Sequence, residues 1–234
     1  METLETENVL GYLEGTDKKD EVLVITAHYD HEGILCGEIY NGADDDGTGT
    51  SAILELAQAF TTAKNEGKSP SRSILFMTVT GEEKGLLGSQ YYTKNPIFPL
   101  SKTIANLNID MIGRIDQFHQ NEDYVYLIGS NRLSTQLHDI SEEINLKYSN
   151  LFLDYKYNAL DDPNKFYYRS DHYNFAKNNI PVIFYFSGVH EDYHKPTDDI
   201  EKILFTKVEK TTQLIFHTAW ELVNREERIV VDVK

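Results

Sequence analysis

Short apolar runs that alternate with helix-like segments restrict the fold of this sequence more than any other feature. SILFMTVT (73–80) and TIANLNID (103–110) are strand-length runs of the kind that is buried on both faces of a sheet. TSAILELAQAFTTAKNEG (50–67) instead carries apolar residues at helical spacing and stops at a glycine. Alternation of this kind predicts an α/β fold, with a mostly parallel sheet covered by helices on both faces.

The remaining predicted elements also alternate between strands and helices. VLGYLEG (9–15) and EVLVITAH (21–28) are separated by a polar turn, which predicts an edge hairpin, and GEEKGLLGSQYYTKN (81–95) predicts a turn entering a helix. Further strands are expected at 123–129 and 180–186, and helices at 131–148, 170–179 and 199–226. Without a repeat, a low-complexity tract or a linker, residues 1–234 are expected to form one domain. The first strand comes so early that we expect a truncated N-terminus.

Composition excludes several classes of protein. The longest uninterrupted apolar run is Ile180–Phe186, whereas a membrane-spanning helix needs roughly 20 residues, so no membrane span is expected. The formal net charge of −16, without a cluster of Lys and Arg, argues against binding to nucleic acid. The single cysteine, Cys36, excludes an internal disulfide and a cysteine-rich metal site.

Acidic and histidine side chains follow four of the predicted strands, at the point where each strand ends. They are His28, Asp30 and His31 after EVLVITA, Glu82 and Glu83 after SILFMTVT, Asp110 after TIANLNI, and His190 and His194 after IPVIFYFSG. The loop NGADDDGTG (41–49) adds Asp44, Asp45 and Asp46. Ligands of open α/β sheets bind outside the carboxyl ends of the strands, so we expect these side chains to share a cation.

Each of these groups has a simpler explanation when it is taken alone. Glu82 and Glu83 could be the acidic first turn of a helix, which the helix dipole favours. The three successive aspartates could be an N-cap cluster or a calcium loop, although the EF-hand pattern is not met. Asp110 is harder to explain in this way, because a buried carboxylate must be paired or bind a metal. Convergence at one edge of the sheet therefore favours the cation.

HEDYH (190–194) has the spelling of the zinc motif H-E-x-x-H, in which both histidines lie on one face of a helix. Here the segment follows a strand and a glycine, Gly188, and Pro196 comes two residues after His194. We therefore predict a loop, in which Glu191 is not a catalytic base and the role of His190 stays open.

Five stretches, in order along the chain, carry a family resemblance: AHYDH, NGADDDGTG, GEEKGLLGS, NIDMIG and DYHKPTDD. The chain resembles the co-catalytic two-zinc aminopeptidases, bacterial leucyl-type enzymes related to glutamate carboxypeptidases and glutaminyl cyclases. The resemblance covers nearly the whole chain and departs from the family at its short N-terminus. It implies a three-layer α/β/α sandwich with a central mixed, mostly parallel sheet, and it suggests a periplasmic or secreted location.

Carried over residue by residue, the resemblance implies a complete metal site. The implied metal ligands are His28, Asp45, Glu83, Asp110 and His194. Asp45, the middle aspartate, is implied to bridge two Zn²⁺ ions, with Glu82 as the general base. Three carboxylates and a bridging hydroxide would balance the charge of the two ions. Oxygen and imidazole ligands suit zinc, and Co²⁺ or Mn²⁺ could also occupy such a site.

Three further residues are candidates for supporting roles. Asp30 can accept a hydrogen bond from the free ring nitrogen of His28. Tyr193 is similar to a tyrosine that in some relatives stabilises the developing oxyanion, or it is one more packed aromatic residue. Asp171 either lies near a helix N-cap or belongs to the site.

The expected function is that of an exopeptidase that releases N-terminal residues from a peptide substrate. A related two-metal carboxypeptidase or glutaminyl cyclase is the alternative. A catalytically inactive binding domain is less favoured, because such relatives lose ligands or the base and this chain retains them all. The sequence indicates neither the side-chain preference nor the oligomeric state.

Overall fold

A seven-stranded sheet forms the centre of the computed structural model, which describes residues 5–233. In spatial order its strands are β1 (Val9–Leu13), β5 (Arg72–Val79), β2 (Lys18–His28), β6 (Thr103–Ile109), β9 (Val182–Phe186), β7 (Tyr124–Ile128) and β8 (Phe152–Asp154). The four central strands β5, β2, β6 and β9 are parallel to one another. Strand β1 is antiparallel to β5, and β7 is antiparallel to β9. The expectation of a mixed, mostly parallel sheet is confirmed.

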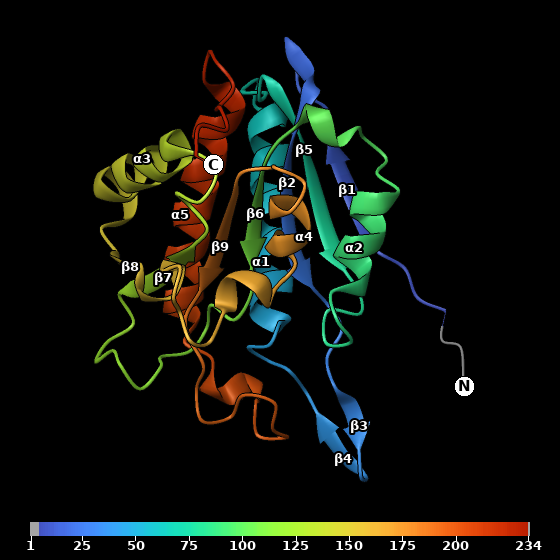
Figure 1. Cartoon of the computed structure of the whole chain (residues 1–234), viewed down its shortest axis with the longest axis vertical. Helices are drawn as coiled ribbons and strands as arrows, with labels where there is room; N and C mark the ends of the chain where they lie inside the picture. The colour runs from blue at the N-terminus through green and yellow to red at the C-terminus, as the bar shows by residue number, and fades with distance from the viewer. Residues whose placement is uncertain (1–4, 234) are drawn as a thin grey trace.

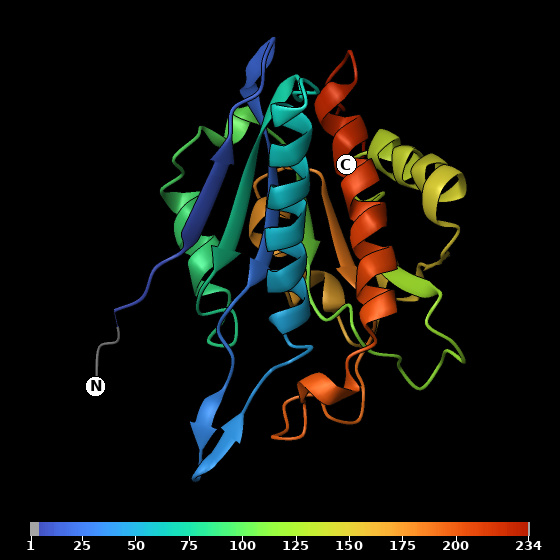
Figure 2. The ribbon, with the colours of Figure 1, turned by 180° about the vertical axis from the view of Figure 1, so that it is seen from behind.

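Helices cover both faces of this sheet (Figure 1, Figure 2). One face carries α1 (Gly47–Asn65) and α5 (Phe205–Asn224), with α3 (Thr135–Ile144) packed beside α5. The other face carries α2 (Leu87–Lys94) and α4 (His172–Ala176), which contact each other. The predicted three-layer α/β/α sandwich is therefore confirmed. Among the described residues, no helix combines the length and the apolar character that a membrane crossing needs.

The alternation of side chains along β2 explains why its buried part is apolar at successive positions from Val22 to Ile25. Leu23 and Ile25 belong to the core cluster shared with α1 and α5, whereas Val22 and Val24 belong to the cluster beneath α2 and α4. Successive side chains of a strand point to opposite faces, so a strand between two helical layers buries every one of them.

The predicted hairpin between residues 9–15 and 21–28 is wrong, because the first strand pairs with a different strand. Strand β1 pairs antiparallel with β5, in the register Val9↔Thr78 to Leu13↔Ile74. Both edges of β2 are already occupied, because β2 pairs in parallel with β5 on one side and with β6 on the other. The position of β1 at the edge of the sheet agrees with the prediction.

A small two-stranded hairpin, absent from the predicted elements, projects from the carboxyl edge of the sheet at the bottom of Figure 1. It consists of β3 (Gly33–Leu35) and β4 (Glu38–Tyr40). Strands this short lack the alternating pattern from which a strand is predicted. The hairpin lies in the connection between His28 and the aspartate loop, next to the candidate site.

Candidate metal centre

The implied ligands and base come from five separate segments at the carboxyl edge of the sheet. His28 is the last residue of β2, Asp110 directly follows β6, and Glu82 and Glu83 lie in the turn after β5. Asp45 lies in the loop before α1, and His194 lies in the loop after β9. Asp45, Glu82, Glu83, Asp110 and His194 line one cavity. Side chains that are far apart in the sequence thus lie together at one edge of the sheet, as their positions at the ends of predicted strands indicated.

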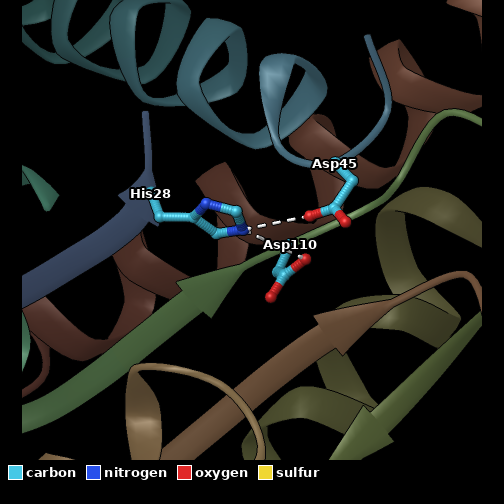
Figure 3. A group of neighbouring side chains, drawn as sticks. All are labelled: His28, Asp45 and Asp110. Atoms are coloured by element: carbon cyan, nitrogen blue, oxygen red, sulfur yellow. Dashed lines mark ion pairs between the residues drawn. The ribbon is translucent and has the colours of Figure 1, made fainter. Parts of the chain in front are cut away.

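Asp45 lies between the two histidines of this group. Its Oδ1 is 3.2 Å from His28 Nε2, and its Oδ2 is 3.2 Å from His194 Nε2. His28 Nε2 also lies 3.8 Å from Asp110 Oδ1, as Figure 3 shows for these three side chains. His194 Nε2 lies 3.2 Å from Glu83 Oε2. A carboxylate with one oxygen directed to each of two ligand sets is the arrangement that a bridging ligand between two cations requires.

Several polar atoms of the cluster are buried without a hydrogen bond to any residue that the structure describes. They include His28 Nε2, Asp45 Oδ2 and Glu83 Oε1. Leaving such atoms unpaired away from water costs free energy, so buried polar atoms nearly always have partners. The ligand atoms of His28, Asp45 and Asp110 lie within 4.8 Å of one another, close enough to hold one ion. Nitrogen and oxygen donors without a thiolate suit a catalytic zinc site. The residues present therefore fit a metal.

Neighbouring aspartates fix the loop that carries Asp45. Asp46 caps helix α1, since its Oδ1 accepts a hydrogen bond from Gly49 N at 2.9 Å. Its Oδ2 accepts a hydrogen bond from His28 N at 3.2 Å, which joins the loop to the end of β2. Asp44 Oδ1 accepts a hydrogen bond from Gly113 N at 2.6 Å. The peptide bond between Asp45 and Asp46 is cis. These contacts leave the carboxylate of Asp45 free to face the cluster.

The adjacent Glu82 and Glu83 have opposite pKa shifts. Burial raises the pKa of Glu82 to about 10, although the nearby His28 opposes this shift. Burial also acts to raise the pKa of Glu83, but contacts with His194 and His31 lower it to about 2. The carboxylates of Asp45 and Glu83 raise the pKa of His194 to about 10. Carboxylates whose environments separate their pKa values in this way are suited to different roles.

Asp30 contacts the cluster differently from the prediction. His28 Nδ1 lies 2.9 Å from the main-chain oxygen of Asp30, whereas the nearer carboxylate oxygen is 3.8 Å away. The carboxylate instead accepts hydrogen bonds from Glu82 N at 3.1 Å and from Glu83 N at 3.4 Å. Asp30 therefore orients His28 through its backbone and holds the glutamate turn through its side chain.

HEDYH is a series of turns and not a helix, as predicted. His194 adopts a left-handed backbone with φ of 54°, which would interrupt any helix through both histidines. Glu191 is exposed, and His190 faces Asp44. Tyr193 stacks on the ring of His194, with ring centroids 3.9 Å apart, and its hydroxyl lies 3.5 Å from Arg169 Nη2.

The cavity beside the cluster has a volume of about 520 Å³, and both aromatic and polar side chains line it. Phe166 and Tyr168 from the segment before α4 and Tyr173 of α4 line it, together with Phe184 and Phe186 of β9. Two cationic residues, Arg169 and Lys177, line it as well. Tyr193 and Glu82 belong to the same wall. The cavity could therefore hold part of a ligand next to the cluster of carboxylates and imidazoles.

Two residues outside the implied set of ligands also lie at the cluster. His31 Nδ1 is 2.9 Å from Glu83 Oε1, and Ser170 Oγ donates a hydrogen bond to Asp110 Oδ2 at 2.6 Å. The position of His31, three residues beyond His28 at a strand end, was the available signal. Asp171, the other candidate, is fully buried and accepts a hydrogen bond from Ser89 Oγ. Burial raises the pKa of Asp171 to about 7.

Comparisons with known proteins find a family and relatives that match most of this chain. The profile of Peptidase family M28 matches residues 8–219. Aminopeptidase YwaD of Bacillus subtilis is 26% identical over 231 residues, which cover 95% of this chain and 46% of YwaD. The chain thus spans about half the length of that relative.

Solved structures share the fold. A zinc aminopeptidase from Bacillus subtilis superposes with a TM-score of 0.73 at 24% identity, covering 97% of this chain and 53% of that one. Glutaminyl cyclase of Porphyromonas gingivalis superposes with a TM-score of 0.70 at 21% identity, covering 91% of this chain and 76% of that one. At such identities the likeness concerns the fold alone.

Proposed function

The chain belongs to peptidase family M28, and from this premise we propose that it is a zinc-dependent aminopeptidase, which hydrolyses the N-terminal residues of peptides. The observation that carries the proposal is the position of Asp45 between His28 and His194, with Glu82 on the wall of the same cavity. The naming of YwaD as an aminopeptidase supports the choice among the activities of the family.

Two zinc ions would be held by this chain's own carboxylates and imidazoles. His28, Asp110 and Asp45 would hold one ion, and Asp45, Glu83 and His194 would hold the other. When bound, such a pair of ions supplies polarisation of the scissile carbonyl and lowers the pKa of water. Co²⁺ or Mn²⁺ could replace zinc with these donors.

Glu82 would act as the general base and then as the acid. It takes a proton from the attacking water at its carboxylate and passes that proton to the leaving amine. Its raised pKa suits the second step, and positive charge in the adjacent cluster would lower that pKa for the first. The hydroxyl of Tyr193 would donate a hydrogen bond to the developing oxyanion. Asp30 holds the Glu82 amide and thereby orients the turn.

Exchange of Glu82 for Gln tests the proposal directly. Glu82→Gln removes the proton-accepting group without changing the size of the side chain, so turnover of leucine anilide should fall by about 10²–10⁴-fold. Zinc content, measured by elemental analysis, should stay that of the wild type. The matched control is Glu191→Gln, at the exposed glutamate of HEDYH, which should retain turnover. Loss of activity in Glu191→Gln but not in Glu82→Gln would contradict the mechanism.

The alternative activities are a carboxypeptidase, which acts at the C-terminus of a peptide, and a glutaminyl cyclase, which catalyses a different reaction at the N-terminus. The resemblance of the sequence motifs to a family whose relatives include glutaminyl cyclases keeps cyclisation of N-terminal glutamine as a second candidate. Peptides with free and with blocked N-termini separate these possibilities, because an aminopeptidase rejects the blocked ones and a carboxypeptidase does not. Conversion of an N-terminal glutamine without release of an amino acid would instead identify a cyclase.

A further inference from the structure

We infer that His31 is a further metal ligand, at the position formed by Asp45, Glu83 and His194; this role rests on the metal centre proposed above. His31 Nδ1 lies 2.9 Å from Glu83 Oε1 and 4.0 Å from Asp45 Oδ2. Two ligands of one zinc ion, with bonds of about 2.1 Å at tetrahedral angles, are separated by about 3.4 Å. His31, Asp45 and Glu83 thus form a group that could itself hold an ion.

The short contact between His31 and Glu83 lacks the directional geometry of a hydrogen bond. Both ring nitrogens of His31 and the Oε1 atom of Glu83 are buried without a hydrogen-bond partner among residues 5–233. The side chain of His31 is only 8% exposed, so its ring nitrogens lie away from bulk solvent. An imidazole placed in this way carries a desolvation cost that coordination of a cation would offset.

The backbone around His31 is shaped to admit the imidazole ring. Gly42 has a φ of +62°, and a Cβ at this position would lie 2.5 Å from His31 Cγ and 2.4 Å from the main-chain oxygen of Asp45. Neither distance is compatible with a side chain at residue 42. Gly42 therefore lets the ring of His31 pack against the loop that carries Asp45, which points the imidazole to the cluster.

His31 makes the two cation positions unequal. The position of His28, Asp110 and Asp45 has one imidazole and three protein ligands, which leaves room for water or substrate. With His31, the other position has two imidazoles and two carboxylates, from His31, His194, Asp45 and Glu83. Zinc sites closed by four protein ligands bind tightly. The position with His31 should therefore fill first and release its ion last.

A spectroscopic measurement on the wild-type protein tests this assignment. The full chain, labelled with ¹⁵N-histidine and loaded with ¹¹³Cd²⁺, should show one-bond ¹¹³Cd–¹⁵N coupling at His31 Nδ1 as well as at His28 and His194. Coupling at His28 and His194 alone would overturn the role of His31 and leave the proposed function intact. A protein that binds neither cadmium nor zinc would overturn the metal centre and the proposed function together.

Calorimetric zinc titration of variants gives a second readout. His31→Gln should weaken one of the two binding steps by about 100-fold or more and leave the other unchanged. His217→Gln is the matched control, because His217 packs on Tyr148 with ring centroids 4.0 Å apart and lies outside the cluster. It should bind both ions as the wild type does. If His31→Gln also does so, His31 is not a ligand.

Discussion

His190 Nε2 lies 3.3 Å from Asp44 Oδ2, so the first histidine of HEDYH faces the residue beside Asp45, while His194 faces Asp45 itself. Asp192 N donates a hydrogen bond to His190 Nδ1 at 3.2 Å. His190 Nε2 and Asp44 Oδ2 have no hydrogen-bond partner among residues 5–233, so their approach is a polar contact without hydrogen-bond geometry. These two contacts add to those of Asp198 in the same loop, whose carboxylate accepts hydrogen bonds from Asp44 N at 3.0 Å and from Asp45 N at 3.2 Å.

Removal of this contact should destabilise the protein. His190→Ala leaves the fully buried Asp44 carboxylate without its imidazole partner, which should cost about 1–3 kcal/mol of unfolding free energy. Urea unfolding in the presence of a chelator measures this cost without a metal contribution. Glu191→Gln, at an exposed neighbour in the same loop, should unfold as the wild type does. Equal stability of both variants would mean that the histidine does not secure the loop.

A second prediction concerns the side chains behind Asp110. Ser170 Oγ donates to Asp110 Oδ2 at 2.6 Å and accepts a hydrogen bond from Asn108 Nδ2 at 2.9 Å. Thr26 Oγ1 in turn donates to Asn108 Oδ1 at 2.6 Å, so the chain of hydrogen bonds continues into the sheet. Ser170→Ala frees Asp110 to rotate and should weaken zinc binding by about 10–100-fold.

Calorimetric titration checks this expectation, and Ser170→Thr serves as the control because it retains the hydroxyl. The alanine variant should be weaker than the threonine variant. The reverse order would show that the size of the side chain, and not the hydrogen bond to Asp110, determines affinity.

Local patterns in the sequence were sufficient to predict the helical and sheet layers of the fold. The run 73–80 became β5 (Arg72–Val79), and the segment 50–67 became α1 (Gly47–Asn65), because burial on both faces and helical amphipathicity are properties of the segment itself. The convergence of His28 and Asp110 also followed, since parallel strands deliver their carboxyl ends to one edge.

Features that depend on distant partners could not be predicted in this way. Nothing within residues 9–13 distinguishes pairing with β2 from pairing with β5, so the partner of β1 was wrong. The hydrogen bonds of the Asp30 carboxylate to the amides of Glu82 and Glu83 join turns that are separated by about fifty residues. The contact of His31 with Glu83 depends on the same approach of two turns and on space at Gly42.

Metal removal should lower the stability of the protein at neutral pH. Asp45, Glu83 and Asp110 place three carboxylates in one cavity, and a bound cation would offset their mutual repulsion. Zinc that binds only the folded state should add about 2.7 kcal/mol at a free concentration of 100 times Kd. Thermal unfolding with zinc and with a chelator measures the difference.

Asp45→Asn is the informative variant for that experiment, because the lost charge lies between both cation positions. Its unfolding temperature should respond to zinc much less than that of the wild type. If zinc did not raise the unfolding temperature of the wild-type protein, the proposed metal centre would be contradicted.

Acid should unfold the protein partly through His172. The ring is fully buried and stacks on Phe184 with centroids 4.7 Å apart, and burial lowers its pKa to about 3. The pKa of an unfolded histidine is about 6.5, so unfolding takes up a proton at any pH between these values. Stability is therefore complete above about pH 6.5 and is lost as the pH falls to about 3, by up to about 5 kcal/mol.

His172→Phe keeps an aromatic ring against Phe184 and cannot take up a proton. The variant should match the wild type within about 1 kcal/mol at pH 7 and become the more stable protein as the pH falls to 4, because only the wild type gains a proton on unfolding. Urea unfolding of both proteins at several pH values, with chelator present throughout, gives the difference at each pH. The carboxylates titrate in both proteins and cancel in that difference, so a pH-independent difference would mean that His172 does not contribute to acid lability.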